Sequence, residues 1–267
     1  STGLIDTCGT GGDGAKTFNI STTVSFVVAA AGVPVAKHGN RAMSSKSGAA
    51  DVLEALGVNL DLAPEQVARC IDEIGIGFLF AQKLHPAMKH AGPVRRELGV
   101  RTVFNLLGPL TNPAGAEYQV LGVYAADRLE LVAGALRELG CRRALVVHGR
   151  DGLDEITTTT ITDAILVEGD APLQRFEIEP AAFGLPYATP EALAGDDSAT
   201  NAAIIRHILA GQHGTGRDIV LLNAAAALWV AGKVPGIPEG LKLAAEAIDS
   251  GRARSRLDEL VRFTQST

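Results

Sequence analysis

The stretch Gly3-Leu-Ile-Asp-Thr-Cys-Gly-Thr-Gly-Gly-Asp-Gly14 lies near the start of the chain and decides the fold. Gly3–Asp6 predict a short buried strand, and Gly9–Gly14 form a glycine-rich turn. An apolar helix is then expected from about Ser21 to Ala31. Glycines between a strand and a helix let bare backbone amides surround phosphate oxygens. A glycine-rich loop alone is equally compatible with a plain tight turn, so other features must decide.

The alternation of strand and helix continues downstream of this first unit. A second strand is expected at Val33–Lys37, with a helix near Ser47–Leu56 because Val52, Leu53 and Leu56 fall at helical spacing. A proline-started helix, Pro64–Ile74, and a strand, Ile76–Phe80, extend the series. This βαβ order predicts a parallel sheet with right-handed crossovers.

The second half of the chain departs twice from this rhythm. Two short helices around His85–His90 and Pro93–Leu98 would leave the sheet. The alternation resumes with the strand Tyr118–Tyr124, the helix Leu129–Leu139 and the strand Arg143–Val147. Consecutive strands at Glu155–Thr160, Asp163–Glu168 and Gln174–Ile178 then predict an antiparallel extension. Helices follow at Ser198–Leu209, Asp218–Val230 and Pro238–Phe263, the last with a break near Gly251. The fold class is therefore α/β, with a largely parallel central sheet flanked by helices.

Composition limits the classes of protein and partner. The 267 residues are 46% hydrophobic and 20% charged, which excludes intrinsic disorder. A net charge of -6 gives no general attraction to nucleic acid or anionic membrane. Cys8, Cys70 and Cys141 are too few and too scattered for a disulfide framework or a zinc ribbon, so a cytoplasmic location is expected. The apolar run Ala224–Ala231 is too short to span a bilayer.

Two further polar segments favour a phosphate site. Asn19–Thr22 places an amide and two hydroxyls at a helix start, where they can cap the helix, bind phosphate or ligate a metal. Lys37–Ser45 follows the second strand, and ligands of open α/β sheets gather at such strand ends. A solvated loop is the alternative for the second segment taken alone.

Asp154 and Glu155 are adjacent carboxylates after the turn that follows the strand ending at Val147. Carboxylates of this kind suit Mg²⁺, which takes few protein carboxylates together with substrate phosphates. An exposed acidic turn is the alternative, and the sequence spacing does not decide between the two.

Five motifs in this order resemble the anthranilate phosphoribosyltransferase family. They are GTGGD at 9–13, NIST at 19–22, KHGNRA at 37–42, NLLGPLTNP at 105–113 and DGLDE at 151–155. The resemblance extends from Leu4 to about Phe263. It implies transfer of a phosphoribosyl group from phosphoribosyl pyrophosphate to anthranilate, with Mg²⁺ as cofactor, on a nucleoside phosphorylase/phosphoribosyltransferase-like fold.

The family's site residues can be placed on the matching positions of this chain. The implied phosphoribosyl pyrophosphate site comprises Gly9, Gly12, Asp13, Thr17, Asn19, Ile20, Ser21, Thr22, Lys37, His38, Gly39, Asn40, Arg41, Ala42, Met43, Ser44, Ser45 and Ala49. The implied anthranilate site comprises Gly9, Asn40, His85, Arg95 and the loop residues Gly108 and Pro109. The implied magnesium ligands are Ser21, Asp154 and Glu155. A planar guanidinium at Arg95 suits a carboxylate because it forms two parallel hydrogen bonds.

The resemblance also implies a domain organisation. Residues 1–81 and 101–267 would form the α/β domain that binds phosphoribosyl pyrophosphate, and residues 82–100 a remnant of a small helical domain. The family's chains begin with a helical segment that this sequence lacks, so we expect a weakened form of the homodimer that is typical of the family.

Two other functions remain open on the residues alone. A pyrimidine nucleoside phosphorylase shares the general architecture, but the intact KHGNRA motif and Arg95 argue against it. A nucleic-acid-binding relative without activity should have basic grooves and damaged phosphate motifs, neither of which the sequence indicates. The sequence contains no Ser-His-Asp or Cys-His arrangement, which favours direct displacement over a covalent intermediate.

Overall fold

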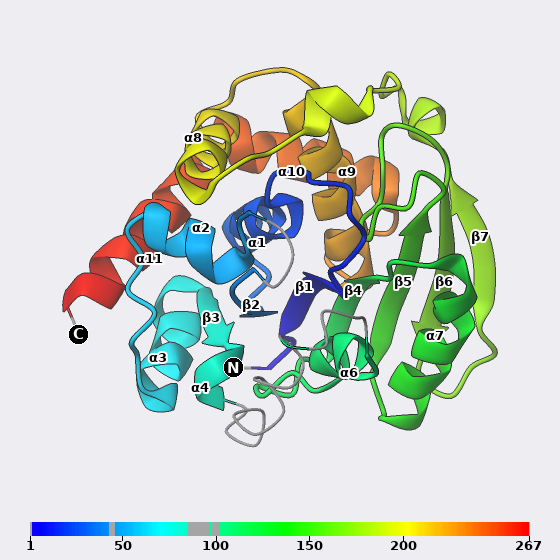
Figure 1. Cartoon of the computed structure of the whole chain (residues 1–267), viewed down its shortest axis with the longest axis horizontal. Helices are drawn as coiled ribbons and strands as arrows, with labels where there is room; N and C mark the ends of the chain where they lie inside the picture. The colour runs from blue at the N-terminus through cyan, green and yellow to red at the C-terminus, as the bar shows by residue number, and fades with distance from the viewer. Residues whose placement is uncertain (1, 43–45, 85–96, 98–101, 267) are drawn as a thin grey trace.

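The computed structural model describes residues 2–42, 46–84, 97 and 102–266, and in this part of the chain the strands form one seven-stranded sheet (Figure 1). The strands are β1 (Ile5–Gly9), β2 (Val35–Gly39), β3 (Ile76–Phe80), β4 (Tyr118–Gly122), β5 (Arg143–Gly149), β6 (Thr162–Glu168) and β7 (Gln174–Ile178). Their order across the sheet is β3-β2-β1-β4-β5-β6-β7. The first five are parallel, and β6 and β7 run antiparallel to their neighbours. The predicted parallel sheet with an antiparallel extension is confirmed.

The parallel strands end together at one edge of the sheet. Gly9 is in register with Gly122 of β4, and Gly39 with Phe80 of β3. The segments that leave β1 and β2 therefore begin side by side. Because helices cover both faces of a parallel sheet, its strands are buried, and in β1, β2 and β3 every residue except the last is buried. The buried residues of β1 and β2 include the polar side chains of Asp6 and Lys37.

The helices flank the sheet on both sides. They are α1 (Ile20–Ala30), α2 (Ala49–Ala55), α3 (Pro64–Ile74), α4 (Ala81–Leu84), α6 (Phe104–Leu110), α7 (Leu129–Glu138), α8 (Ser198–Leu209), α9 (Thr215–Val230), α10 (Ile237–Asp249) and α11 (Arg252–Ser266). Three short 3-10 turns lie at Ala126–Arg128, Pro180–Phe183 and Pro190–Leu193.

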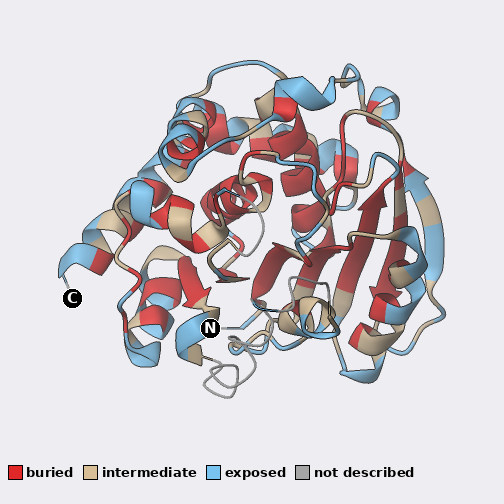
Figure 2. Ribbon diagram, in the orientation of Figure 1, coloured by how far each residue is buried: buried red, intermediate tan, exposed pale blue. Residues whose placement is uncertain are grey.

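Two hydrophobic clusters cover the faces of the sheet. The larger surrounds α1 and α9, which is buried from Ile219 to Leu228 (Figure 2). Small side chains let the helices approach closely there: a Cβ atom at Gly240 of α10 would lie 2.6 Å from the carbonyl oxygen of Ala225. The smaller cluster packs α7 against the outer strands through Val132 and Leu136. The aromatic-poor composition thus produces a core of closely spaced Ala, Val, Ile and Leu.

Several sequence predictions need correction or lie beyond the described residues. Glu155–Thr160, expected as a strand, is an irregular segment with bends. Gly108 and Pro109, expected in a loop, belong to the last turn of helix α6. The two short helices expected at 85–90 and 93–98 lie outside the described residues, apart from Glu97. In the part of the chain that the structure describes, none of the helices combines the length and apolarity needed to cross a membrane.

Candidate active site

The glycine loop that leaves β1 meets the acidic pair of a distant segment. The backbone N–H of Gly11 donates to Oδ2 of Asp154 at 2.7 Å. Gly11 and Gly12 have φ values of 68° and 76°, a left-handed conformation that favours glycine. The loop can therefore turn an amide toward the carboxylate, which lies 143 residues further along the chain.

Two glycines, which have no side chains, allow Asp154 to contact the carboxyl ends of the strands β1 and β4. A Cβ atom at Gly9, the last residue of β1, would overlap the Asp154 carboxylate. A Cβ atom at Gly122, the last residue of β4, would overlap the Asp154 backbone. Both positions require glycine because nothing larger leaves room for the acidic segment.

Glu155 faces the start of α1. The backbone N–H of Ser21 donates to Oε1 of Glu155 at 3.2 Å. Lys37, buried in the middle of β2, donates from Nζ to the Thr7 carbonyl at 2.6 Å and to the Ser21 hydroxyl at 3.3 Å. One hydroxyl, one lysine and one carboxylate from three segments thus converge beside the glycine loop.

The acidic pair has unusual electrostatics. Burial raises the pKa of Asp154 well above its usual range, and the charges of Asp13 and Glu155 add to the rise. Burial raises the pKa of Glu155 to about 7, although Lys37 and Ser21 oppose the shift. Two carboxylates that are costly to ionise without a further positive charge form a place where a cation would be stabilised.

These groups fit Mg²⁺. It binds through one or two carboxylates and keeps other positions for water and phosphate oxygens, and the hydroxyl of Ser21 lies next to the pair. The predicted ligands Ser21, Asp154 and Glu155 are brought together here, although their chain positions are far apart.

A second network joins the end of β2 to helix α6. Asp6, fully buried in β1, accepts from the His38 backbone N–H at 3.1 Å and from Nδ2 of Asn112 at 2.8 Å. The same Asn112 amide donates to the Ala36 carbonyl at 2.9 Å. Burial raises the pKa of Asp6, while Lys37 and Asn112 lower it. Asp6 thereby ties the second phosphate segment to the segment that follows α6.

Gly108 and Pro109 lie at the C-terminal end of α6. A Cβ atom at Gly108 would lie 3.9 Å from Cε1 of His38, so the backbone runs close to that imidazole. The Pro109 carbonyl accepts from Nε2 of Gln119 in β4 at 2.7 Å. Of the two residues predicted for the aromatic substrate, Gly108 therefore borders β2 and Pro109 borders β4.

Arg41 and Asn40 leave β2 in different directions. The guanidinium of Arg41 donates to Oδ1 of Asp51 at 3.0 Å and to both carboxylate oxygens of Glu54, and it lies 5.5 Å from the ring centroid of Phe80. The side chain is thus engaged with α2. Asn40 is exposed, and its Oδ1 accepts from Gln82 at 3.3 Å.

Other predicted site residues take mixed positions. Ile20 and Thr22, in the first turn of α1, are both buried. Thr17 forms an isolated bridge with Ala194. A Cβ atom at Gly39 would lie 3.0 Å from the Cβ of Ala49, which starts α2. Met43, Ser44, Ser45, His85 and Arg95 lie outside the described residues.

Sequence reasoning missed residues that hold the acidic segment in place. Asn223 of α9 accepts from the Ile156 N–H at 3.0 Å and donates to the Ile156 carbonyl at 2.7 Å. Asp151 accepts from the Leu153 N–H and from the Thr157 hydroxyl. A polar residue inside the apolar run of α9 was a signal for Asn223, but its partner could not be read from the sequence.

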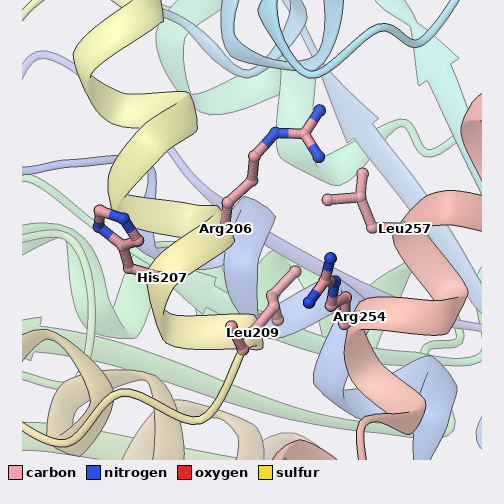
Figure 3. A pocket seen from close by; sticks show the side chains of 6 residues that line it. Arg206, His207, Leu209, Arg254 and Leu257 are labelled. Carbon is pink, nitrogen blue, oxygen red and sulfur yellow. The ribbon is translucent and has the colours of Figure 1, made fainter.

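A cavity of about 210 Å³ lies elsewhere, between α8 and α11 (Figure 3). Arg206, His207, Leu209, Ala210, Arg254 and Leu257 line it. Arg206 donates to the Leu56 carbonyl at 2.8 Å and so holds the end of α2. None of the five motifs contributes to this cavity, which is separate from the sheet edge.

The sheet edge with its glycine loop, buried lysine and acidic pair defines the class of protein. Residues 1–254 match the family described as "Glycosyl transferase family, a/b domain". The chain is therefore a glycosyl transferase with the α/β domain of that family.

Relatives and solved structures narrow this class. The chain is 57% identical to the anthranilate phosphoribosyltransferase of Acetivibrio thermocellus over 98% of its own length and 76% of that protein. It is 49% identical to the crystal structure of the Thermus thermophilus enzyme of the same name, with a TM-score of 0.93, covering 99% of this chain and 79% of that one. The Saccharomyces cerevisiae enzyme in complex with phosphoribosyl pyrophosphate and Mg is 30% identical, with a TM-score of 0.91, and the match covers 99% and 74% of the two chains.

The chain belongs to the anthranilate phosphoribosyltransferase family. Its function is the phosphoribosyl transfer that gives this family its name, which decides among the three functions left open by the residues. The chain spans about three quarters of the length of these relatives.

Proposed function

We propose that the sheet edge at Gly9, Gly122 and Asp154 binds the pyrophosphate of phosphoribosyl pyrophosphate together with Mg²⁺, and that anthranilate approaches from α6. The observation that carries this proposal is the pair of carboxylates with raised pKa, held against a glycine loop by the hydrogen bond from Gly11 to Asp154. Solved structures of the yeast relative hold phosphoribosyl pyrophosphate and Mg, or 4-fluoroanthranilate, which supports the same ligands here.

The residues of this chain perform binding and electrostatic work. Asp154, Glu155 and Ser21 would hold Mg²⁺, and the positive charge of Lys37 opposes the rise in the pKa of Glu155 that burial causes. Bound Mg²⁺ supplies positive charge to the pyrophosphate oxygens. The segments after β1 and β2 fix the phosphates so that C1 of the ribose stays open to attack.

The reaction is proposed as a direct displacement with a loose, cation-like transition state. As the bond from C1 to pyrophosphate breaks, positive charge grows on the ribose and negative charge on the leaving group. The amine of anthranilate is neutral at pH 7, so its position matters more than a strong general base. The amine attacks C1 and then releases a proton, giving N-(5-phosphoribosyl)anthranilate and pyrophosphate.

The deciding experiment measures turnover with a matched pair of carboxylate variants. Anthranilate, phosphoribosyl pyrophosphate and Mg²⁺ are mixed with the protein, and loss of anthranilate fluorescence is compared with release of pyrophosphate. We expect one pyrophosphate per anthranilate consumed. Asp154→Asn should abolish turnover, while Asp163→Asn, a surface carboxylate paired with Arg150, should leave it unchanged. Equal losses in both variants would contradict the assignment of the acidic pair.

A second pair of variants tests the aromatic substrate. Arg95→Ala should raise KM for anthranilate because it removes the guanidinium proposed for the carboxylate, and KM for phosphoribosyl pyrophosphate should stay unchanged. Arg96→Ala, the adjacent arginine, is the control. Phosphorolysis of a pyrimidine nucleoside without anthranilate turnover would instead favour the phosphorylase. The division into an α/β domain and a helical remnant at 82–100, the homodimer and the cytoplasmic location remain predictions.

A further inference from the structure

Asn201 lies in the first turn of α8 and belongs to none of the five motifs, yet its side chain contacts a residue of the predicted phosphate site. Its side chain is 1% exposed. Its Nδ2 donates to Oδ1 of Asn19 at 3.0 Å, although 182 residues separate the two. Asn19 precedes α1 and belongs to the proposed phosphoribosyl pyrophosphate site. Helix α8 packs beside α2 and touches α1 (Figure 1).

The direction of this contact follows from a backbone donor. The N–H of Asp196 donates to Oδ1 of Asn201 at 2.8 Å. An N–H can only donate, so the atom of Asn201 that it meets must be the oxygen. The other end of the Asn201 amide is then the NH₂ group, which must face an acceptor. The orientation of Asn19 is thereby determined, with its oxygen toward Asn201.

The rest of the Asn19 amide is consistent with this orientation. Its Oδ1 also accepts from the Ser47 hydroxyl at 3.3 Å, so both lone pairs of that oxygen are used. Its Nδ2 donates one hydrogen to the Ser47 carbonyl at 3.2 Å. Among the described residues the second hydrogen of this NH₂ group has no acceptor, and a phosphate oxygen could accept from it.

The segment before α8 holds the same loop at other points. The Leu193 carbonyl accepts from the Phe18 N–H at 3.2 Å, and the Gly195 N–H donates to the Lys16 carbonyl at 2.9 Å. A Cβ atom at Gly195 would lie 2.6 Å from Oδ1 of Asn201, so the segment and the amide are closely fitted. These contacts make α8 part of the framework around the glycine loop.

We propose that Asn201 is a positioning residue that orients the Asn19 amide as a hydrogen-bond donor toward a phosphate oxygen of phosphoribosyl pyrophosphate. The inference rests on the proposed function of the sheet edge. Asn201 itself touches no substrate in this assignment and acts through Asn19 alone.

Asn201→Asp is the sharpest test because it preserves size and the acceptor for the Asp196 N–H but removes the donor. Asn19 must then turn its NH₂ group toward the new carboxylate, which aims its oxygen at the phosphate. We expect KM for phosphoribosyl pyrophosphate to rise about tenfold or more, as for loss of one hydrogen bond to a charged group. KM for anthranilate and kcat should change little, because the lost hydrogen bond binds the substrate equally strongly before and during the reaction. Thr264→Val, a remote buried hydroxyl that accepts from the Asn59 N–H, controls for destabilisation.

A double-mutant cycle separates the orienting role from the added charge. In an Asn19→Ala background the amide to be oriented is gone, so Asn201→Asp should have little further effect on KM for phosphoribosyl pyrophosphate. A tenfold rise that persists in that background would overturn the proposal, because it would show direct repulsion of the substrate.

The remaining outcomes are also decisive. If Asn201→Asp does not fold, Asn201→Ala replaces it, and an unchanged KM in that folded variant overturns the proposal. Turnover by the parent protein is measured first. If the parent shows no turnover, the proposed function is contradicted, but the orientation of Asn19 by Asn201 is not. In that case the affinity for phosphoribosyl pyrophosphate in the presence of Mg²⁺ is measured by calorimetry. Equal affinities of the parent and Asn201→Asp would overturn the proposal that Asn201 orients Asn19.

Discussion

Two acidic regions of the molecule differ in what balances their charge. At the sheet edge, burial raises the pKa of Asp154 and Glu155, and the one lysine beside them is shared with a carbonyl and a hydroxyl. At the outer end of β6, Arg150 pairs with Asp163 and Glu177 and lowers the pKa of Asp163. In the second region an arginine of the protein stabilises the ionised carboxylates, while the carboxylates of the first region are costly to ionise until a cation binds. This difference separates a binding site from a structural ion pair.

Removing the charge of Glu155 at the sheet edge should have the largest effect on activity. We expect Glu155→Gln to lower kcat/KM by about 100-fold or more, a loss typical of one preorganised electrostatic group at a reacting centre. The same variant should raise Tm of the metal-free protein, because a neutral amide is easier to bury than a carboxylate. Turnover assays and thermal unfolding in a chelator measure the two. A lower Tm would show that Glu155 stabilises the fold, contrary to the comparison.

The pH dependence of metal-free stability should distinguish the same variant from its parent. The pKa of Glu155 is raised to about 7 in the folded state, so the folded protein binds the extra proton more tightly than the unfolded chain. The resulting stabilisation is present below the unfolded pKa of about 4.3 and is lost as pH rises toward 7. Thermal unfolding across this window should show the decline in the parent and a flatter curve in Glu155→Gln. Parallel curves would contradict the raised pKa.

A half-buried ion pair should give an intermediate effect. Asp249, about half exposed, accepts two hydrogen bonds from the buried Arg217, which hold its pKa low. Asp249→Asn should reduce the free energy of unfolding by about 1 kcal/mol near pH 7, a value discounted for solvent screening. Because the native pKa is lowered, the difference from the parent should be full above about pH 4 and shrink as pH falls further. Urea unfolding at several pH values measures it, with activity near pH 7 unchanged.

Loss of the exposed ion pairs should have the smallest effect on stability. Arg150→Gln removes the contacts with Asp163 and Glu177, all of which are reached by solvent. We expect a small change in Tm at low salt that disappears at an ionic strength on the order of 1 M. A loss of Tm that survives high salt would show that this cluster contributes packing as well as charge.

The sequence predicted the sheet well and the acidic segment poorly. Ile76–Phe80 was placed correctly because it is a buried, continuous apolar run between turn residues. Gln174–Ile178, a largely exposed edge strand, was placed correctly because Phe176 and Ile178 alternate with polar residues. Glu155–Thr160 has a similar β propensity but forms an irregular segment with bends. Asp151 binds the Thr157 hydroxyl, and Asn223 binds the Ile156 peptide, so tertiary hydrogen bonds override the local preference.

Motifs predicted which residues gather at the site but not what holds them there. Gly9, Ser21 and Asp154 were all expected, since each belongs to a motif that supplies phosphate or metal ligands. Asn112 and Asn201 were not, because a buried amide has no local signature of its partner. Arg41 was expected at the phosphate, and only the structure places its guanidinium against Asp51 and Glu54. The sequence could not predict this, because the partners of the Arg41 side chain lie on the following helix, α2.

The hydrogen bond from Gly11 to Asp154 spans 143 residues, and this distance has a consequence for synthesis of the chain. The contact cannot form before the intervening strands have been synthesised, and non-local contacts of this kind slow folding. A ribosome-bound chain that ends before Asp154 has its glycine loop but not the carboxylates that complete the cation site. The cation site is therefore incomplete on the ribosome until the segment after β5 has emerged, and its support is incomplete until Asn223 of α9, which binds the Ile156 peptide, has followed.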